Sequence, residues 1–133
     1  MTYYEIIVGT LAYLIVTFPY AYVWHMKIFK EKYLQWQYFG RDAKPILGLL
    51  SMVIQGIVLS YGYSLLAIDH ASLLAGLGYA TIMGVFFWST HVIAAMAKHG
   101  ETRTLEFFLM ETVYLSIQFV VFGILISFTY RAF

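Results

Sequence analysis

The sequence has no cysteine, and charged residues make up only 11% of its 133 positions. The lack of cysteine excludes a disulfide scaffold and thiolate chemistry. The low charge content excludes an ordinary soluble domain, which carries about 25% charged residues, because too little polar surface is left to cover a water-soluble globule. The formal net charge of +1 gives no basic footprint for nucleic acid, so we expect no nucleic-acid partner.

Long apolar stretches dominate what is present: 62% of the residues are hydrophobic and the mean hydropathy is +0.76. A helix needs about 20 mostly apolar residues to cross roughly 30 Å of hydrocarbon. Four stretches satisfy this requirement, at about residues 5–24, 45–68, 71–97 and 105–130. They are continuously apolar rather than alternating, which favours helices over a β-barrel. The sequence therefore predicts an all-α, integral membrane four-helix bundle that forms a single transmembrane domain over residues 1–133.

The basic residues predict the orientation of this bundle. Seven of the eight lysines and arginines fall in the first and third connections, whereas the remaining one, Arg131, is near the C-terminus. By the positive-inside rule, we expect a multi-pass protein of the inner (cytoplasmic) membrane with both termini outside and the basic connections in the cytoplasm. The first apolar stretch has no basic flank and no small-residue cleavage site, so we expect a retained span rather than a signal peptide.

The first connection contains a periodic pattern of its own. Phe29, Tyr33 and Trp36 recur at i, i+4 and i+7 with lysines between them, which predicts a short amphipathic interfacial helix that ends at Gly40. The alternative is an aromatic-rich loop that follows the first span. In either case, we expect contact with lipid headgroups from Lys27, Lys30, Lys32, Trp36, Arg41 and Lys44.

Small residues recur every four positions in two of the spans. Membrane helices associate through such residues because they let two backbones approach closely. We expect the two rows to face each other across an antiparallel hairpin that turns at Asp69 and His70, or one row to face another subunit. The row of the third span is Ser72, Gly76, Ala80 and Gly84, and that of the second is Gly56, Ser60 and Ser64.

Four polar residues fall inside the predicted spans, namely His91, Glu111, Gln55 and Gln118. Placing a polar group at this depth in hydrocarbon costs free energy, so such groups usually face the interior of a bundle. His91 and Glu111 lie roughly 10 Å inside the cytoplasmic edge on consecutive antiparallel helices, so their side chains can meet. One interpretation is a site that carries protons or recognises cations. The other is a satisfied polar pair that fixes the third span against the fourth.

The sequence gives little support to metal, cofactor or catalytic chemistry. We considered a copper site built from His25, His91 and His99 with Met26 or Met96. The histidines have no HxxxH or ExxH spacing, so we expect no metal site, and the sequence leaves open whether haem or another cofactor binds. It contains no GxSxG, P-loop or HExxH motif, so we expect no catalytic residues.

The layout of the whole chain carries one resemblance. The first span ends in an aromatic cluster of Tyr20, Tyr22 and Trp24, and the second begins AKPILGLL at residues 43–50. The third span is glycine-rich over residues 73–84, and a short polar loop within 99–115 precedes the fourth. In this order the chain resembles a family of small four-helix bacterial inner-membrane proteins of unknown function. The resemblance implies the fold and no activity. His91 stands where the family pattern has Asn or a similar small polar residue.

These observations leave three functional hypotheses. The first is a non-catalytic accessory or scaffolding subunit that packs against itself or against other membrane-protein subunits, with membrane lipids as its other partners. The second is a small proton-linked transporter or carrier that uses a buried pair of His91 and Glu111. The third, a membrane enzyme, has the least support because no catalytic motif is present.

Overall fold

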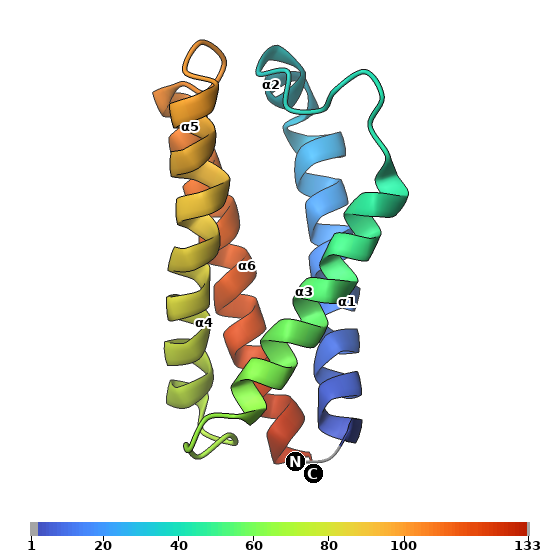
Figure 1. Ribbon diagram of the computed structural model, residues 1–133, viewed down its shortest axis with the longest axis vertical. Coiled ribbons are helices and arrows are strands. Elements are labelled where there is room, and N and C mark those ends of the chain that lie inside the picture. The colour runs from blue at the N-terminus through green and yellow to red at the C-terminus, as the bar shows by residue number, and fades with distance from the viewer. Residues whose placement is uncertain (1–2, 133) are drawn as a thin grey trace.

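The computed structural model describes residues 3–132, which form helices and no β-strand (Figure 1). The predicted all-α fold is confirmed. Two of the elements, η1 and η2, are π-helical turns that continue α1 and α4 without a break in the chain. The elements are α1 (Tyr3–Val23), η1 (Trp24–Ile28), α2 (Lys30–Gln35), α3 (Pro45–Ser64), α4 (Leu73–Trp88), η2 (Ser89–Ile93), α5 (Ala94–Lys98) and α6 (Leu105–Arg131).

Four continuous rods in this fold are long and apolar enough to cross a membrane: Tyr3–Ile28, Pro45–Ser64, Leu73–Lys98 and Leu105–Arg131. The second rod ends four residues earlier than predicted. Residues 65–72 form a turn instead, in which the Tyr63 hydroxyl donates to the His70 carbonyl at 2.8 Å and the His70 Nε2 contacts the Tyr63 carbonyl at 2.9 Å. These two hydrogen bonds close the turn and stop the helix at Ser64.

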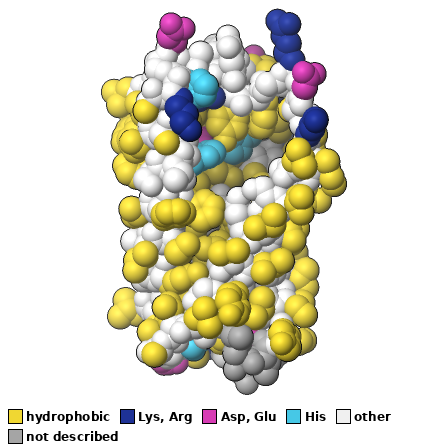
Figure 2. All heavy atoms as spheres, in the orientation of Figure 1, with side chains coloured by type: hydrophobic (Ala, Val, Ile, Leu, Met, Phe, Trp, Pro, Cys, Tyr) yellow, Lys and Arg dark blue, Asp and Glu magenta, His cyan; other side chains and the backbone are white. Residues whose placement is uncertain are grey.

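The connections and termini gather at two opposite ends of the bundle (Figure 1). We call the end that holds residues 29–44 and 99–104 the basic end, and the end that holds residues 65–72 and both termini the terminal end. In Figure 2 apolar side chains cover the sides of the visible face, and the charged side chains lie towards the two ends. Such a surface suits a molecule whose middle is surrounded by hydrocarbon.

The helices pack closely in two pairs, α1 with α3 and α4 with α6 (Figure 1). A Cβ added at Gly76 of α4 would collide with the carbonyl oxygen of Gly123 on α6. A Cβ added at Gly9 of α1 would lie 2.6 Å from the Ser60 Oγ on α3. Glycine therefore allows close approach in both pairs, of backbone to backbone at Gly76 and of backbone to a serine side chain at Gly9.

This pairing corrects the predicted arrangement of the small-residue rows, which do not face each other. Gly76, Ala80 and Gly84 face α6, where a Cβ at Gly84 would lie 3.1 Å from the Phe119 ring. Gly56 and Ser60 face α1 instead of α4. The two remaining residues of the rows, Ser72 and Ser64, make hydrogen bonds close to their own positions in the chain. The Ser72 hydroxyl accepts from the Ala75 amide and caps α4, and the Ser64 hydroxyl donates to the Tyr61 carbonyl.

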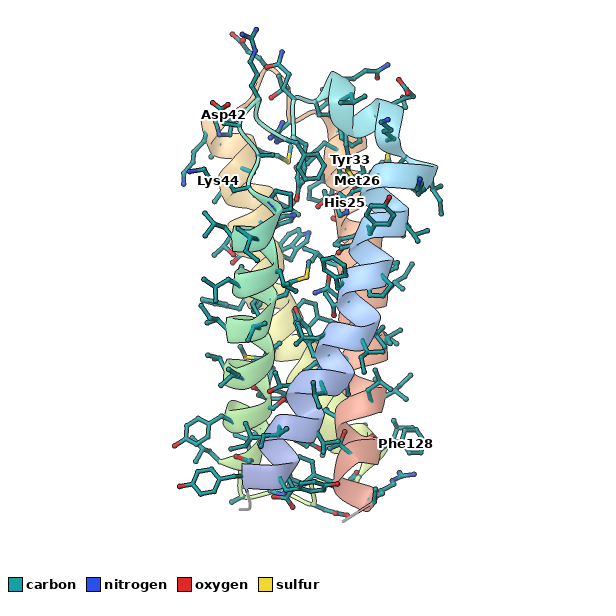
Figure 3. All side chains as sticks on the ribbon, turned by 90° about the vertical axis from the view of Figure 1, so that its right-hand side faces the viewer. His25, Met26, Tyr33, Asp42, Lys44 and Phe128 are labelled. Atoms are coloured by element: carbon teal, nitrogen blue, oxygen red, sulfur yellow. The ribbon has the colours of Figure 1, made fainter. Side chains whose placement is uncertain are left out.

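The helix in the first connection, α2, is shorter than predicted and ends at Gln35 rather than at Gly40. The headgroup prediction is wrong for Trp36, which is only 4% exposed because its ring packs edge-on against Phe107 of α6, with ring centroids 5.4 Å apart. Tyr33 is 1% exposed for the same reason, since the connection folds back on the bundle. The lysines and arginine of that prediction keep their side chains exposed or half-exposed at the basic end, with Lys44 labelled in Figure 3: Lys27, Lys30, Lys32, Arg41 and Lys44.

Candidate functional site

A single carboxylate, that of Glu111 on α6, is fully buried near the basic end. Its Oε2 lies 2.7 Å from the Nε2 of His91. Its Oε1 accepts a short hydrogen bond from the Tyr33 hydroxyl and lies 3.6 Å from the Nε2 of His25. Four elements, η1, α2, η2 and α6, thus contribute one side chain each to a cluster around one carboxylate. We call these residues (His25, Tyr33, His91 and Glu111) the Glu111 cluster.

Both histidines of the cluster lie in the π-helical turns, His25 in η1 and His91 in η2. A π turn inserts an extra residue and rotates the side chains that follow it around the helix axis; such turns occur frequently at functional sites. The remaining turns of the two helices keep their packing faces, while the π turns let both imidazoles reach Glu111. Figure 3 shows His25 and Tyr33 close together near the basic end.

The tautomer of His25 is fixed by its backbone contact. Its Nδ1 lies 2.8 Å from the Ala21 carbonyl oxygen, which can only accept, so Nδ1 carries a proton. In the neutral imidazole the buried Nε2 then has a lone pair, and it has no hydrogen-bond partner. That lone pair faces the Glu111 Oε1, also an acceptor. One added proton, on His25 or on Glu111, would turn this contact from repulsive to attractive.

Tyr33 is held as a donor to the carboxylate. The indole Nε1 of Trp24 donates to the Tyr33 hydroxyl oxygen at 2.7 Å, which leaves the hydroxyl proton free for Glu111. Burial raises the pKa of Tyr33 above its usual value of 10.0, and the neighbouring Glu111 charge raises this pKa further. Tyr33 therefore remains a protonated donor throughout the physiological pH range.

Tyr38 completes the site from the chain segment after α2. Gln37 adopts a left-handed conformation with φ of 50°, and the Tyr38 amide then donates to the Tyr33 carbonyl at 3.1 Å. This reversal brings the Tyr38 hydroxyl within 3.0 Å of the His91 Nε2. Burial and the Glu111 charge raise the pKa of Tyr38, although the nearby Arg103 acts in the opposite direction.

A polar cleft of about 290 Å³ reaches the cluster from the basic end. In Figure 2 it is the hollow near the basic end, with histidine side chains inside and basic side chains at its border. The His91 side chain is 36% exposed there, whereas Glu111 behind it is fully buried. His91 is thus the point at which water can approach the cluster. The lining residues are Tyr38, Thr90, His91, Ala95, Lys98, His99 and Arg103.

The other two residues of the predicted site form a separate group, deeper in the bundle. The Tyr13 hydroxyl donates to the Gln55 Oε1 at 2.8 Å and accepts from the Gln118 Nε2 at 3.1 Å, which links α1, α3 and α6. Within residues 3–132, no hydrogen bond joins this group to the Glu111 cluster. The predicted set of four is therefore two sites, because the Tyr114 ring occupies the turn between Glu111 and Gln118 and stacks on Tyr20.

Sequence reasoning missed His25, Tyr33 and Tyr38 as members of one site. It ended the first span at Trp24, so His25 was placed outside the bundle and appeared only in the copper alternative. In the structure the helix continues to Ile28 and places His25 beside Glu111, and no pattern in the sequence indicates this extension. Tyr33 was interpreted as an interfacial aromatic, and no local pattern indicates that it turns inward.

The residues described contain no group of three or more histidines and carboxylates arranged to hold a metal ion. His99 lines the cleft together with His91, whereas His25 contacts the buried side of the cluster at Glu111. Comparison with protein-family models, curated proteins and solved structures gives no match. The resemblance to small four-helix inner-membrane proteins therefore stays a prediction. Fold and site together define the chain as an all-α bundle of four span-length helices around a buried carboxylate.

Proposed function

We propose that this protein is a multi-pass protein of the inner membrane, with both termini outside and the basic end in the cytoplasm. Support comes from the four apolar rods and from the gathering of seven of the eight lysines and arginines at one end. In this arrangement α2 lies at headgroup level, and anionic lipids meet the exposed cations Lys27, Lys30, Lys32, Arg41 and Lys44.

The absence of native cysteine makes this orientation simple to test. Gly40→Cys places one thiol at the basic end, where nothing lies within 4 Å of the new Cβ, and Ala132→Cys places one at the exposed C-terminal turn. We expect a membrane-impermeant maleimide to label Ala132→Cys in intact cells and Gly40→Cys only after lysis. The reverse pattern would place the basic end outside and contradict the proposal.

Within this membrane frame, we propose that the protein is a small proton-linked carrier whose Glu111 cluster takes up and releases one proton. The observation that carries this proposal is the fully buried Glu111 carboxylate facing the unpartnered Nε2 of His25 at 3.6 Å. With Glu111 ionised and both imidazoles neutral, the cluster has one negative charge. One added proton brings it to zero, which lowers the cost of holding the cluster inside a bilayer.

The cleft gives the proton its route. Water at the basic end reaches His91, and His91 contacts the Glu111 Oε2 at 2.7 Å. A proton that arrives through His91 binds to the Glu111 carboxylate and stays there as a carboxylic acid, which removes the repulsion between Oε1 and the lone pair of the His25 Nε2. Trp24 and Tyr33 hold the carboxylate in place during this exchange through their chain of hydrogen bonds.

The test is Glu111→Gln, which keeps the size and an acceptor oxygen for Tyr33 but cannot bind the proton. In a pH titration followed by infrared difference spectroscopy, we expect the wild type to gain the carbonyl band of a buried carboxylic acid and Glu111→Gln to lack it. Proton flux into liposomes under an imposed potential should fall in parallel. Glu106→Gln is the matched control, because this carboxylate lies on the same helix, half-exposed and 2.7 Å from Lys32. Unchanged band and flux in Glu111→Gln would contradict the proposal.

A second candidate function, a non-catalytic packing subunit, is favoured by a different observation. An open groove of about 280 Å³ runs along the outer side of α4 and α6, and its lining includes the small or hydroxyl residues Ala80, Thr81, Gly84, Thr112 and Ser116. Such a surface suits a further transmembrane helix, from a second copy or from another subunit. Under this proposal the chain leaves the membrane in a complex, so a stable monomer in mild detergent would count against it.

A further inference from the structure

The cleft at the basic end also contains charged side chains that take no part in the proposed proton uptake. Its lining includes two permanent cations, Lys98 and Arg103, together with His99. Of the residues that line it, none is a carboxylate. Its volume of about 290 Å³ corresponds to roughly ten waters at their share of liquid volume, so a tetrahedral ion fits with part of its hydration shell.

The short connection between α5 and α6 brings both cations to the lining of the cleft. Lys98 is the last residue of α5, and Arg103 directly precedes the Thr104 cap of α6. The Arg103 amide donates to the His99 carbonyl at 2.9 Å and closes the turn between them. The backbone position of Lys98 is therefore fixed by the end of α5, and that of Arg103 by this hydrogen-bonded turn.

Arg103 is held rigidly and still has donors to offer. Its Nη1 donates to the Trp36 carbonyl and to the Thr102 hydroxyl, and its guanidinium carbon lies 5.6 Å from the Tyr38 ring centre and 5.1 Å from that of Phe107. Its buried Nε has no hydrogen-bond partner. An arginine fixed in this way loses little side-chain entropy when it binds an anion, and its planar fork suits two oxygens of a phosphate.

Neither permanent cation of the cleft is paired with an acid. Across residues 3–132, neither Lys98 nor Arg103 has a carboxylate oxygen within 4.0 Å, whereas Lys32 at the same end has Glu106 at 2.7 Å. We propose that the cleft binds a phosphate group through Arg103 and Lys98, with His99 at its edge. The group belongs either to the headgroup of a cytoplasmic-leaflet phospholipid or to a free phosphate. This proposal is independent of proton uptake, because the two cations are charged whether or not Glu111 is protonated.

Two measurements distinguish the sources. In mild detergent at low ionic strength, calorimetry measures the affinity for inorganic phosphate. In nanodiscs, native mass spectrometry measures how much phosphatidylglycerol is retained over phosphatidylcholine. We expect binding in at least one of these experiments, and we expect Lys98→Gln to weaken it about tenfold, the loss of one charge-assisted hydrogen bond. Arg131→Gln removes an exposed cation at the terminal end, away from the cleft lining and from the cations at headgroup level near the basic end, and should leave the affinity unchanged.

Arg103→Gln should weaken binding further, but it also breaks the contact with Trp36, so the exposed Lys98 is the main test. Binding of phosphate alone assigns a soluble ligand, and retention of phosphatidylglycerol alone assigns a lipid. Absence of both overturns the proposal, as does an equal loss in Lys98→Gln and Arg131→Gln. Glu111→Gln should keep full phosphate affinity, so failure of the proton-carrier proposal would leave this result unchanged.

Discussion

The half of the bundle near the basic end and the half near the terminal end hold their helices together by different contacts. Near the terminal end, glycine allows close approach, of backbone to backbone at Gly76 with Gly123 and of backbone to a serine side chain at Gly9 with Ser60. Near the basic end, the contacts run through aromatic rings and the Glu111 carboxylate. Close glycine packing is sufficient to associate helices in lipid. The buried polar cluster is not needed for helix association of this kind, which is why the function that we propose is placed in the basic half.

This comparison also explains where the chain departs from regular helix. The two π turns lie in the basic half, and each presents a histidine. The straight α-helical parts of α4 and α6 pass each other at glycine contact in the other half. A regular helix serves close packing, whereas an inserted residue re-aims a side chain. The π turns therefore mark the boundary between the packing half, near the terminal end, and the half that contains the Glu111 cluster.

The largest expected effect comes from removing the carboxylate altogether. Glu111→Ala leaves a cavity and deprives Tyr33 and His91 of their shared acceptor, so we expect unfolding in mild detergent to become easier by about 3–5 kcal/mol. Glu106→Ala removes a half-exposed carboxylate from the same helix and should cost at most about 1 kcal/mol. Denaturant titration followed by circular dichroism measures both. Equal losses would mean that the cluster adds no more stability than a surface ion pair.

A smaller effect tests the packing half. Gly76→Ala forces a Cβ against the carbonyl oxygen of Gly123, where backbone rather than a flexible side chain must yield. Overpacking of this kind costs about 1–3 kcal/mol. Gly78→Ala is the matched control two residues away, with nothing within 4 Å of the new Cβ, and it should be neutral or stabilising by up to about 1 kcal/mol. If both variants unfold like the wild type, close glycine packing does not hold α4 to α6.

The comparison of the two halves also shows how far sequence reasoning reaches. The four rods could be predicted because length and apolar composition alone decide whether a helix can span hydrocarbon. The meeting of His91 with Glu111 could be expected, because depth along antiparallel helices follows from the rise per residue. Thr104 was not assigned a site role, yet its position before an apolar run is typical of the helix cap that the structure contains.

What could not be predicted depends on rotations and partners that composition does not encode. A π turn changes the face of the helix on which His25 lies, and no residue pattern in WHMKI (residues 24–28) indicates such a turn. The glycine rows indicate close packing but do not name the partner helix, so Gly76 was paired with α3 rather than with α6. Aromatic residues such as Trp36 suit both a headgroup layer and a protein core, and only the folded connection decides between them.

The smallest expected effect is a loss of stability at alkaline pH that arises in the basic half and not in the half near the terminal end. Burial raises the pKa of Tyr38 above its usual value of 10.0, so its protonated form stabilises the fold fully below about pH 10, and this contribution is lost as pH rises through and beyond that value. By linkage, the loss reaches about 1.4 kcal/mol at pH 11 for one tyrosine whose unfolded pKa is about 10. Tyr38→Phe removes the hydrogen bond to His91, which lowers the unfolding free energy by about 1 kcal/mol at neutral pH. Because phenylalanine does not ionise, this variant does not show the loss of stability at alkaline pH.

The unfolding free energies of the wild type and of Tyr38→Phe should therefore converge between pH 8 and pH 11, with most of the change above pH 10. Denaturant titrations at each pH measure this difference. Tyr3→Phe, which alters a side chain 85% exposed at the terminal end, should run parallel to the wild type over the same range. If Tyr38→Phe also runs parallel, Tyr38 reaches water as freely as Tyr3. The basic half would then be open to solvent beyond His91, and the exclusion of water from Glu111 on which proton coupling depends would be lost.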